Sequence, residues 1–274
     1  MNKFESEGKC AYCFRKLSAD KVSKHLQSCS IRTEALPFPG KRQNTFLLEV
    51  RGKRFPEYWM FLEVNRDTCM LKDIDTCLRG LWLECCGHLS SFTINNQRYE
   101  SHPHEEYDFK DKSMQVRVNR IFEEGMIFEY IYDFGSSTEL LIRVVSVVNQ
   151  LEEEEERGNK LNRLDARASK LSQVTGKKVK EKGKSRQLHS SFPPSHPSHL
   201  VTIAARNEPI IFTCNSCEKA VATNICTICL YDKSRKGASL CDRCVRYHKC
   251  GEDMFLPIVN SPRSGECGYA GEDD

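Results

Sequence analysis

The sequence lacks any apolar run long enough to span a bilayer. Its longest apolar stretches, Met126 to Tyr132 and Leu140 to Val148, are interrupted by polar residues and fall far short of the ~20 residues that a transmembrane helix needs. The first nine residues carry acidic side chains where a signal peptide has an apolar stretch. We therefore expect a cytoplasmic protein that has no membrane partner.

Cysteine, by contrast, is abundant, with fifteen in 274 residues. A reducing cytosol keeps thiols free, so repeated C-x2-C pairs in a cytoplasmic chain indicate metal sites rather than disulfides. Eight of the fifteen cysteines form such pairs: Cys10/Cys13, Cys214/Cys217, Cys226/Cys229 and Cys241/Cys244. The composition therefore predicts a metal-binding protein.

The chain divides into four segments by composition. Residues 1–40 form a small Cys/His module, residues 43–150 have the apolar periodicity of a folded domain, and residues 207–274 hold a dense cysteine cluster. Residues 151–206 read as a charged linker rich in Ser, Pro and His. Within it, the stretch from Arg157 to Arg186 has eleven basic and two acidic residues, a net charge of +9. Such a block is typical of a solvated linker, and it can also contact nucleic acid.

The segment 43–150 predicts an α+β fold, a mainly antiparallel sheet with one principal helix, flanked by small zinc-binding modules. The helix begins near Thr68, which is a suitable N-cap, and apolar residues recur after it at helical spacing. Gly87 can end this helix. A turn is expected at Asn95-Asn96, and Gly135-Ser136-Ser137 separates the two strands of a hairpin. The expected strands are 44–51, 58–65, 92–99, 127–134 and 140–148.

The N-terminal module has the spacing of a zinc finger, C-x2-C-x11-H-x3-C, in Cys10, Cys13, His25 and Cys29. Zinc takes four sulfur or nitrogen ligands in a tetrahedron, and a turn followed by a helix supplies them at this spacing. His25 and Cys29 are four residues apart and so share one helix face. The pattern resembles a C2H2-type finger whose last ligand is Cys, a C2HC finger.

The C-terminal segment contains eight candidate ligands between Cys214 and Cys250, enough for two tetrahedral zinc ions. The two C-x2-C pairs and the later string Leu240-Cys241-Asp242-Arg243-Cys244 with His248 resemble a B-box-type finger. That resemblance implies interleaved sites. One would use Cys214, Cys217, Cys241 and Cys244, and the other Cys226, Cys229, His248 and Cys250. Two sequential sites are the alternative, and Cys267 is a further thiol that could replace Cys250.

The middle segment resembles the plasmid pRiA4b ORF-3-like family. The resemblance rests on the string 127–135, with Tyr132-Asp133-Phe134-Gly135 as its most specific part, and on His88-Leu-Ser-Ser-Phe92. It implies an α+β fold without an established activity. A historical label links the family to transposon resolvases, but the Arg that a tyrosine recombinase needs three residues after its His is absent after His88. His88, Tyr132 and Asp133 are candidate pocket residues.

The sequence predicts three structural zinc ions, because every predicted site is closed by four protein ligands and leaves no position for a reactive water. No catalytic residue is predicted. We expect a non-enzymatic adapter or regulator that contacts nucleic acid or protein, with its oligomeric state undetermined. One alternative is a small-molecule sensor that uses the central domain. Another is a recombinase or hydrolase linked to mobile elements, which would need convergent acid and base residues in a deep cleft.

Overall fold

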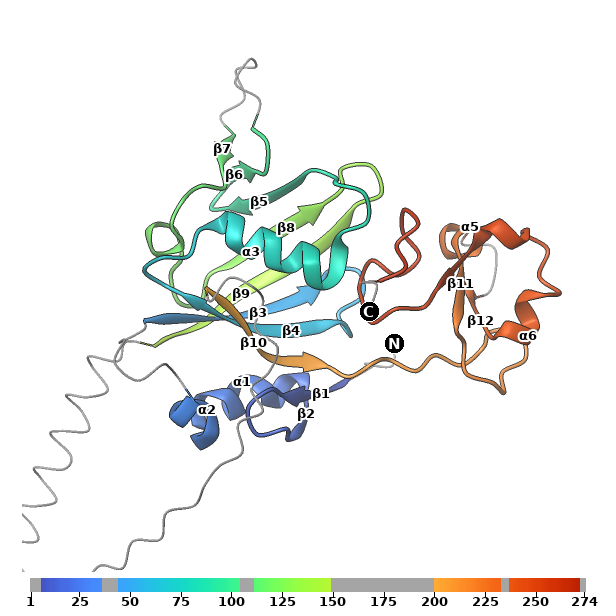
Figure 1. Ribbon diagram of the computed structural model, residues 1–274, viewed down its shortest axis with the longest axis horizontal. Helices are drawn as coiled ribbons and strands as arrows, with labels where there is room; N and C mark the ends of the chain where they lie inside the picture. The colour runs from blue at the N-terminus through green and yellow to red at the C-terminus, as the bar shows by residue number, and fades with distance from the viewer. Residues whose placement is uncertain (1–5, 36–43, 104–110, 149–199, 233–236, 272–274) are drawn as a thin grey trace, which may run out of the picture.

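The computed structural model describes residues 6–35, 44–103, 111–148, 200–232 and 237–271 (Figure 1). The predicted linker therefore lies outside the described residues, apart from its last part, 200–206. Within the described part, no helix is long and apolar enough to cross a membrane.

The main body is a ten-stranded sheet with the order β2-β1-β10-β4-β3-β9-β8-β5-β6-β7. All neighbouring strands pair antiparallel except β6 and β7, which are parallel. This confirms the predicted α+β class. The strands are β1 (Glu7–Cys10), β2 (Lys16–Ser18), β3 (Thr45–Gly52), β4 (Trp59–Asn65), β5 (Ser90–Ile94), β6 (Gln97–Glu100), β7 (Lys112–Ser113), β8 (Ile127–Tyr132), β9 (Thr138–Val148) and β10 (Val201–Asn207).

A second, smaller sheet belongs to the C-terminal part of the chain. Its three strands have the order β12-β11-β13, and short helices that follow the strands or join them pack beside it (Figure 1). The elements are β11 (Asn224–Cys226), α5 (Thr227–Tyr231), β12 (Ser239–Leu240), α6 (Asp242–Val245), the 3-10 turn η3 (Glu252–Met254) and β13 (Phe255–Pro257). Among the described residues, its buried apolar cluster consists of Cys214, Leu240 and Cys241, with half-buried side chains such as Val245 and Phe255 packed against it. Such a small core stabilises a fold poorly by itself.

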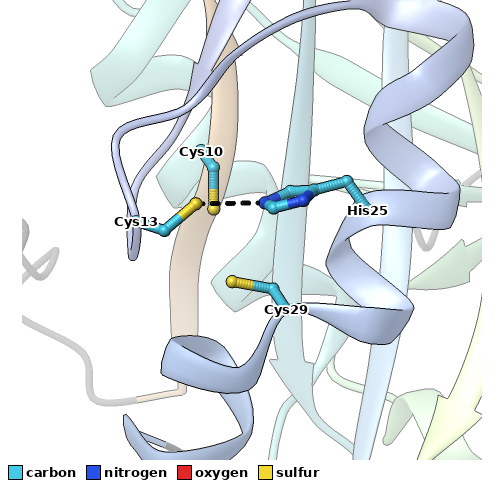
Figure 2. Close-up of side chains that lie close together, drawn as sticks. All are labelled: Cys10, Cys13, His25 and Cys29. Carbon is cyan, nitrogen blue, oxygen red and sulfur yellow. Dashed lines mark hydrogen bonds between the residues drawn. The ribbon is translucent and has the colours of Figure 1, made fainter.

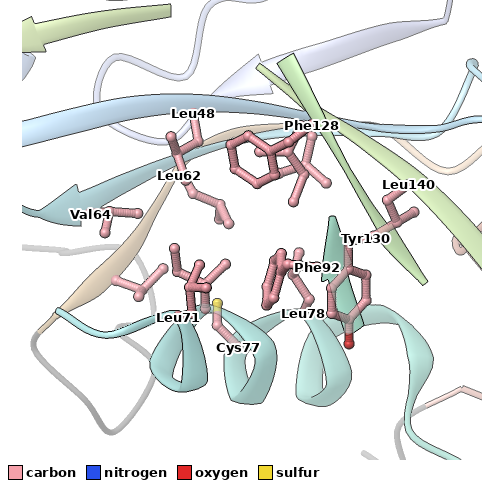
Figure 3. Close-up of a cluster of buried hydrophobic side chains, with 14 of the residues drawn as sticks. Leu48, Leu62, Val64, Leu71, Cys77, Leu78, Phe92, Phe128, Tyr130 and Leu140 are labelled. Carbon is pink, nitrogen blue, oxygen red and sulfur yellow. The ribbon is translucent and has the colours of Figure 1, made fainter. Parts of the chain in front are cut away.

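One face of the main sheet packs against helix α3 (Leu71–Leu78) and the wider turn η1 (Arg79–Leu83) that continues it. Alternate side chains of β3 and β4 point to this face, among them Leu48 and Leu62, and they meet Leu71 and Leu78 of the helix (Figure 3). Trp82, fully buried, closes one end of the same core. This is the expected amphipathic helix on an antiparallel sheet.

The other face of the same strands is covered by the N-terminal module. Helices α1 (Ala19–Ser28) and α2 (Ser30–Ala35) lie opposite α3 across the sheet (Figure 1). Val22 and Leu26 of α1 pack against Trp59 and Phe61 of β4. Residues 59–64 of β4 are therefore buried without interruption, as expected for a strand that is covered on both faces.

Two predicted turns are confirmed. Asn95 and Asn96 have positive φ angles of 50° and 62°, the conformation that a two-residue hairpin turn requires, and they join β5 to β6. Strands β8 and β9 form the predicted hairpin, with Tyr132 opposite Thr138 at its closed end.

Three expectations are corrected. The helix begins at Leu71 with Met70 as its N-cap residue, because Thr68 instead belongs to the preceding turn, where its hydroxyl donates to Asn65 at 2.7 Å. It also ends before Gly87, since Glu84 is already extended. In addition, residues 201–206, assigned above to the linker, belong to β10. Val201, Ala204 and Ala205 of this strand are buried, and the strand lies between β4 and β1.

Candidate metal centres

The N-terminal finger brings its four predicted ligands together. Cys10 ends β1, Cys13 follows in the turn, His25 lies on α1 and Cys29 is its C-terminal cap. Their ligand atoms all lie within 4.8 Å of one another, and Cys13 Sγ is 3.2 Å from His25 Nε2 (Figure 2). The side chains converge on one point, as a tetrahedral metal site requires.

The surroundings of this group fix its position on the central sheet. The hydroxyl of Tyr12 donates to the carboxylate of Glu63 on β4 at 2.6 Å, and Arg32 of α2 forms a buried ion pair with the same carboxylate. Burial raises the pKa of the Cys10 thiol to about 11. Metal binding therefore has to displace that proton, because the thiolate is the ligand.

The C-terminal cluster forms two groups. Cys214, Cys217, Cys241 and Cys244 gather at one, and Cys226, Cys229, His248 and Cys250 gather at the other, with all ligand atoms of each group within 4.8 Å. The first and third C-x2-C pairs thus lie together, the arrangement of interleaved rather than sequential sites. Cys250 Sγ is 3.7 Å from Cys229 Sγ, so Cys250, not Cys267, lies in the second group.

Hydrogen bonds from backbone amides lower the pKa of one thiol in these groups, that of Cys214. Burial raises the pKa of Cys214, but hydrogen bonds from the backbone of Cys217, Cys241 and Ser216 outweigh it and lower the pKa to about 6. Cys226 has no comparable set of donors, and burial raises its pKa to about 11. Cys214 and Cys226, which lie in different groups, therefore differ in acidity, and a divalent cation would displace the remaining thiol protons of either group on binding.

The spacing within the groups fits zinc. With Zn–S near 2.3 Å and Zn–N near 2.05 Å, the edges of a tetrahedral site are about 3.8 Å for two sulfurs and about 3.6 Å for sulfur and nitrogen. The Sγ–Sγ separations are 4.0 Å for Cys217–Cys241 and 3.7 Å for Cys229–Cys250. The sulfur–nitrogen separations are 3.2 Å in the N-terminal group and 3.3 Å in the C-terminal one.

A fourth Cys/His group, which the sequence analysis did not anticipate, lies on the central domain. Cys85, Cys86, His88 and Cys267 have their ligand atoms within 4.8 Å of one another. The first three follow η1 in the chain, whereas Cys267 comes from the C-terminal tail, defined here as residues 258–271. Sequence spacing cannot reveal such a group, because Cys86 and Cys267 are 181 residues apart.

The candidate pocket residues His88, Tyr132 and Asp133 do lie together. The His88 and Tyr132 rings are 5.8 Å apart, and His88 Nε2 is 3.4 Å from Asp133 Oδ2. The tail residue Arg263, fully buried, fills the space beside them. Its guanidinium donates to Asp133 Oδ2 at 2.8 Å and lies 4.7 Å above the Tyr132 ring.

Arg263 was missed because a lone Arg in a polar tail carries no sequence signal. Its guanidinium also donates to Thr138 Oγ1 at 3.0 Å and to the carbonyl of Ser136 at 3.0 Å. Burial opposes the charge of Asp133, but the bond from Arg263, the backbone bond from Gly135 and the nearby positive charge together outweigh it and lower the pKa of that carboxyl. The Tyr132-Asp133 turn is therefore a docking point for the tail.

Two cavities lie elsewhere. One, of about 180 Å³, is lined by Phe55 and Tyr58 of the central domain, Leu230 of the C-terminal module and Pro262 of the tail, among others. The second, of about 360 Å³, is a cleft lined by charged and polar side chains, including Lys72, Asp75, Arg79, Glu84 and His102. None of the three candidate pocket residues lines either cavity.

The comparisons with known proteins agree with the resemblance noted in the central segment. Residues 52–169 match the family model described as Plasmid pRiA4b ORF-3-like protein. The chain thus contains a pRiA4b ORF-3-like domain. The metal groups at both ends of the chain lie outside the matched residues, whereas three members of the fourth group lie inside them. No curated protein matches the chain.

Among solved structures, the chain is similar to a protein of unknown function, MM3350, from Methanosarcina mazei Go1. The two are 17% identical, the match covers 40% of this chain and 63% of the other, and the TM-score is 0.34. The chain therefore spans less than two thirds of the length of that protein.

Proposed function

We propose that this protein is a non-enzymatic adapter or regulator in which zinc folds the terminal modules and their basic surfaces contact nucleic acid or protein. The N-terminal C2HC finger and the B-box-like double site would hold three structural zinc ions. Four ligand atoms from the protein converge in each group, which leaves no coordination position for substrate or reactive water. Metal chemistry is therefore a poor candidate for the function.

The observation that carries the proposal is the exposed basic surface around α6. Arg243, Arg246 and Lys249 are all exposed, and Tyr247 between them has 80% of its surface exposed. Arginines beside an exposed aromatic ring are enriched where proteins bind partners, and the same combination stacks on bases and pairs with phosphates. The basic residues between Arg157 and Arg186 would add positive charge to the chain that binds the nucleic acid.

The test is binding of the zinc-loaded chain to a random pool of single- and double-stranded DNA and RNA at 50 mM and 200 mM salt. If phosphate contacts are made, affinity falls steeply between the two salt concentrations, because each contact releases counterions. The variant Arg243→Glu/Arg246→Glu should weaken binding at least about tenfold, since several phosphate contacts are lost or made repulsive.

The matched control is Arg117→Glu/Arg120→Glu, which makes the same change of charge at two exposed positions of the central domain. It should bind nearly as well as the unchanged protein. Equal weakening by both variants would mean that only net charge matters. The absence of salt-dependent binding to every pool would remove the nucleic-acid version and leave a protein partner.

A second candidate function, small-molecule sensing, is favoured by the charged cleft beside α3. Lys72 and Arg79 lie there with Asp75 and Glu84, a lining suited to a small polar ligand. Changes in the NMR chemical shifts of the backbone amides of Lys72, Arg79 and His102 on addition of phosphorylated or carboxylated metabolites would support this candidate function. Unchanged shifts across such a set would argue against this candidate.

A further inference from the structure

We infer that Cys85, Cys86, His88 and Cys267 form a fourth zinc site, which clamps the C-terminal tail onto the central domain. The inference does not depend on the proposed function, because it concerns how the tail is held. It starts from the geometry of the four side chains, which come from two segments far apart in the sequence.

The sulfur–sulfur separations within this group match a tetrahedral site as well as those of the two C-terminal groups do. Cys85 Sγ is 3.7 Å from Cys86 Sγ, and Cys86 Sγ is 3.9 Å from Cys267 Sγ, close to the sulfur–sulfur edge of about 3.8 Å for zinc. His88 Nε2 lies 2.9 Å from Cys86 Sγ and 3.2 Å from Cys267 Sγ. One imidazole nitrogen thus faces two sulfurs of different segments.

The neighbouring charges suit a zinc ion with three thiolates, a unit with a net charge of −1. Arg263 donates to Cys85 Sγ at 3.3 Å and so places a buried positive charge beside one ligand. Arg263 also donates to Asp133, whose carboxylate lies near His88. Such outer contacts orient metal ligands and stabilise the charge of the site.

The backbone after the ligands repeats a feature of a predicted site. Gly87 follows Cys86 with a φ of 80°, and Gly268 follows Cys267 with a φ of 71°. Gly251, which follows Cys250 in the C-terminal module, has a φ of 92°. A Cβ would meet nothing within 4 Å at any of the three glycines, so backbone conformation, rather than space, explains glycine there.

A metal at this position would complete the docking of the tail. Ser261 already donates to the Trp82 carbonyl at 2.6 Å, and Asn260 bonds to Asn207 of β10 at 2.6 Å. Arg263 adds the buried contacts with Asp133 and Thr138. The zinc would add the last attachment, at Cys267. A metal that links Cys86 to Cys267 closes a loop of 181 residues. Such a link strongly restricts the conformations of the unfolded chain.

The site is also the most open of the four groups in the described part of the chain. Cys86 and Cys267 are exposed, whereas the other three groups contain buried and half-buried ligands only. Water and chelators therefore reach this metal most easily, since the protein around a site controls access to it. Zinc should leave it first and release the tail.

The experiment is elemental analysis of the full chain, purified under reducing conditions, combined with the time course of zinc transfer to a chelator. The unchanged protein should hold one more zinc than Cys267→Ser and release one equivalent in a fast phase. That phase should be missing in Cys267→Ser. The variant Cys267→His, which restores a ligand, should regain the metal.

Cys77→Ala is the matched control, because Cys77 is a buried thiol of α3 outside all four groups. It should keep the full zinc content and the fast phase. Hydrogen exchange of residues 259–267 should rise in Cys267→Ser and stay low in the control. Equal zinc in the unchanged protein and Cys267→Ser, or a Cys86–Cys267 disulfide in the reduced preparation, would overturn the inference. Neither result would bear on nucleic-acid binding by α6.

Discussion

At the scale of single residues, the contact between the N-terminal module and the central sheet depends on two unusual positions. Gly8 of β1 lies directly against Trp59, and Arg32 of α2 forms a buried ion pair with Glu63 of β4. Neither position has a signal in the sequence, because a Gly in a short strand and an Arg in a short helix are both common.

Gly8→Ala should destabilise the protein. A Cβ at this position would lie 2.3 Å from the Trp59 ring and 2.4 Å from the Arg206 carbonyl oxygen. Since Trp59 is fully buried, it cannot move aside freely, and overpacking of this kind costs about 1–3 kcal/mol. Thermal unfolding should show the loss. Gly135→Ala, whose Cβ meets only an ordinary contact at 3.4 Å, should change the midpoint little.

Arg32→Met should cost about 3–5 kcal/mol, because it leaves the carboxylate of Glu63 buried without its charge partner. Both side chains are about 95% buried, with 5% and 4% of their surface exposed. The double variant Arg32→Met/Glu63→Leu should recover much of the loss, since it removes the second charge as well. Denaturant unfolding of both variants is the measurement. A double variant less stable than the single one would contradict this account.

At the scale of elements, α1 has two tasks, because it supplies His25 to the metal group and covers the second face of the sheet. The sequence predicted the first task from ligand spacing. The second depends on β10, a strand from the end of the predicted linker that lies between β1 and β4. From its ligand spacing alone, the finger would be a separate small module, but in this protein it is part of the main body.

Leu26→Ala should cost about 2–5 kcal/mol and loosen the finger from the sheet. Leu26 is fully buried and packs in the cluster with Trp59, Phe61 and Ala204, so its truncation leaves a cavity. Faster hydrogen exchange in β10 is the expected sign. Gln27→Ala, on the exposed side of the same helix, should leave exchange unchanged. Unchanged exchange in Leu26→Ala as well would mean that α1 does not hold β10 in place.

At the scale of the whole molecule, stability has two sources. The central domain has a large apolar core, whereas the C-terminal module has a buried cluster of three residues. Burial of apolar surface can stabilise the first without metal, but not the second. Zinc at the candidate sites would therefore set the fold of the C-terminal module and leave the central core nearly independent of metal.

Removal of metal by a strong chelator should unfold residues 214–257 and spare the sheet from β3 to β9. Metal binding contributes about 10–16 kcal/mol in finger peptides, far more than the small C-terminal core can supply. Residue-resolved hydrogen exchange before and after chelation is the test, with zinc added back as the control. Protected amides in β11 and β12 without metal would contradict the prediction.

The sequence by itself determined the features that depend on short spacing. Helical periodicity gave α3, Asn95-Asn96 gave its hairpin, and ligand spacing selected the twelve side chains that the structure gathers into three groups. Only the tertiary structure decided that β10 joins the finger to the sheet, that Arg263 fills the space beside Asp133, and that Cys267 meets Cys86. These contacts join segments more than a hundred residues apart, and no local periodicity or spacing records which distant partner a side chain will meet. The cysteines of the chain are thus ligand candidates at four places rather than three.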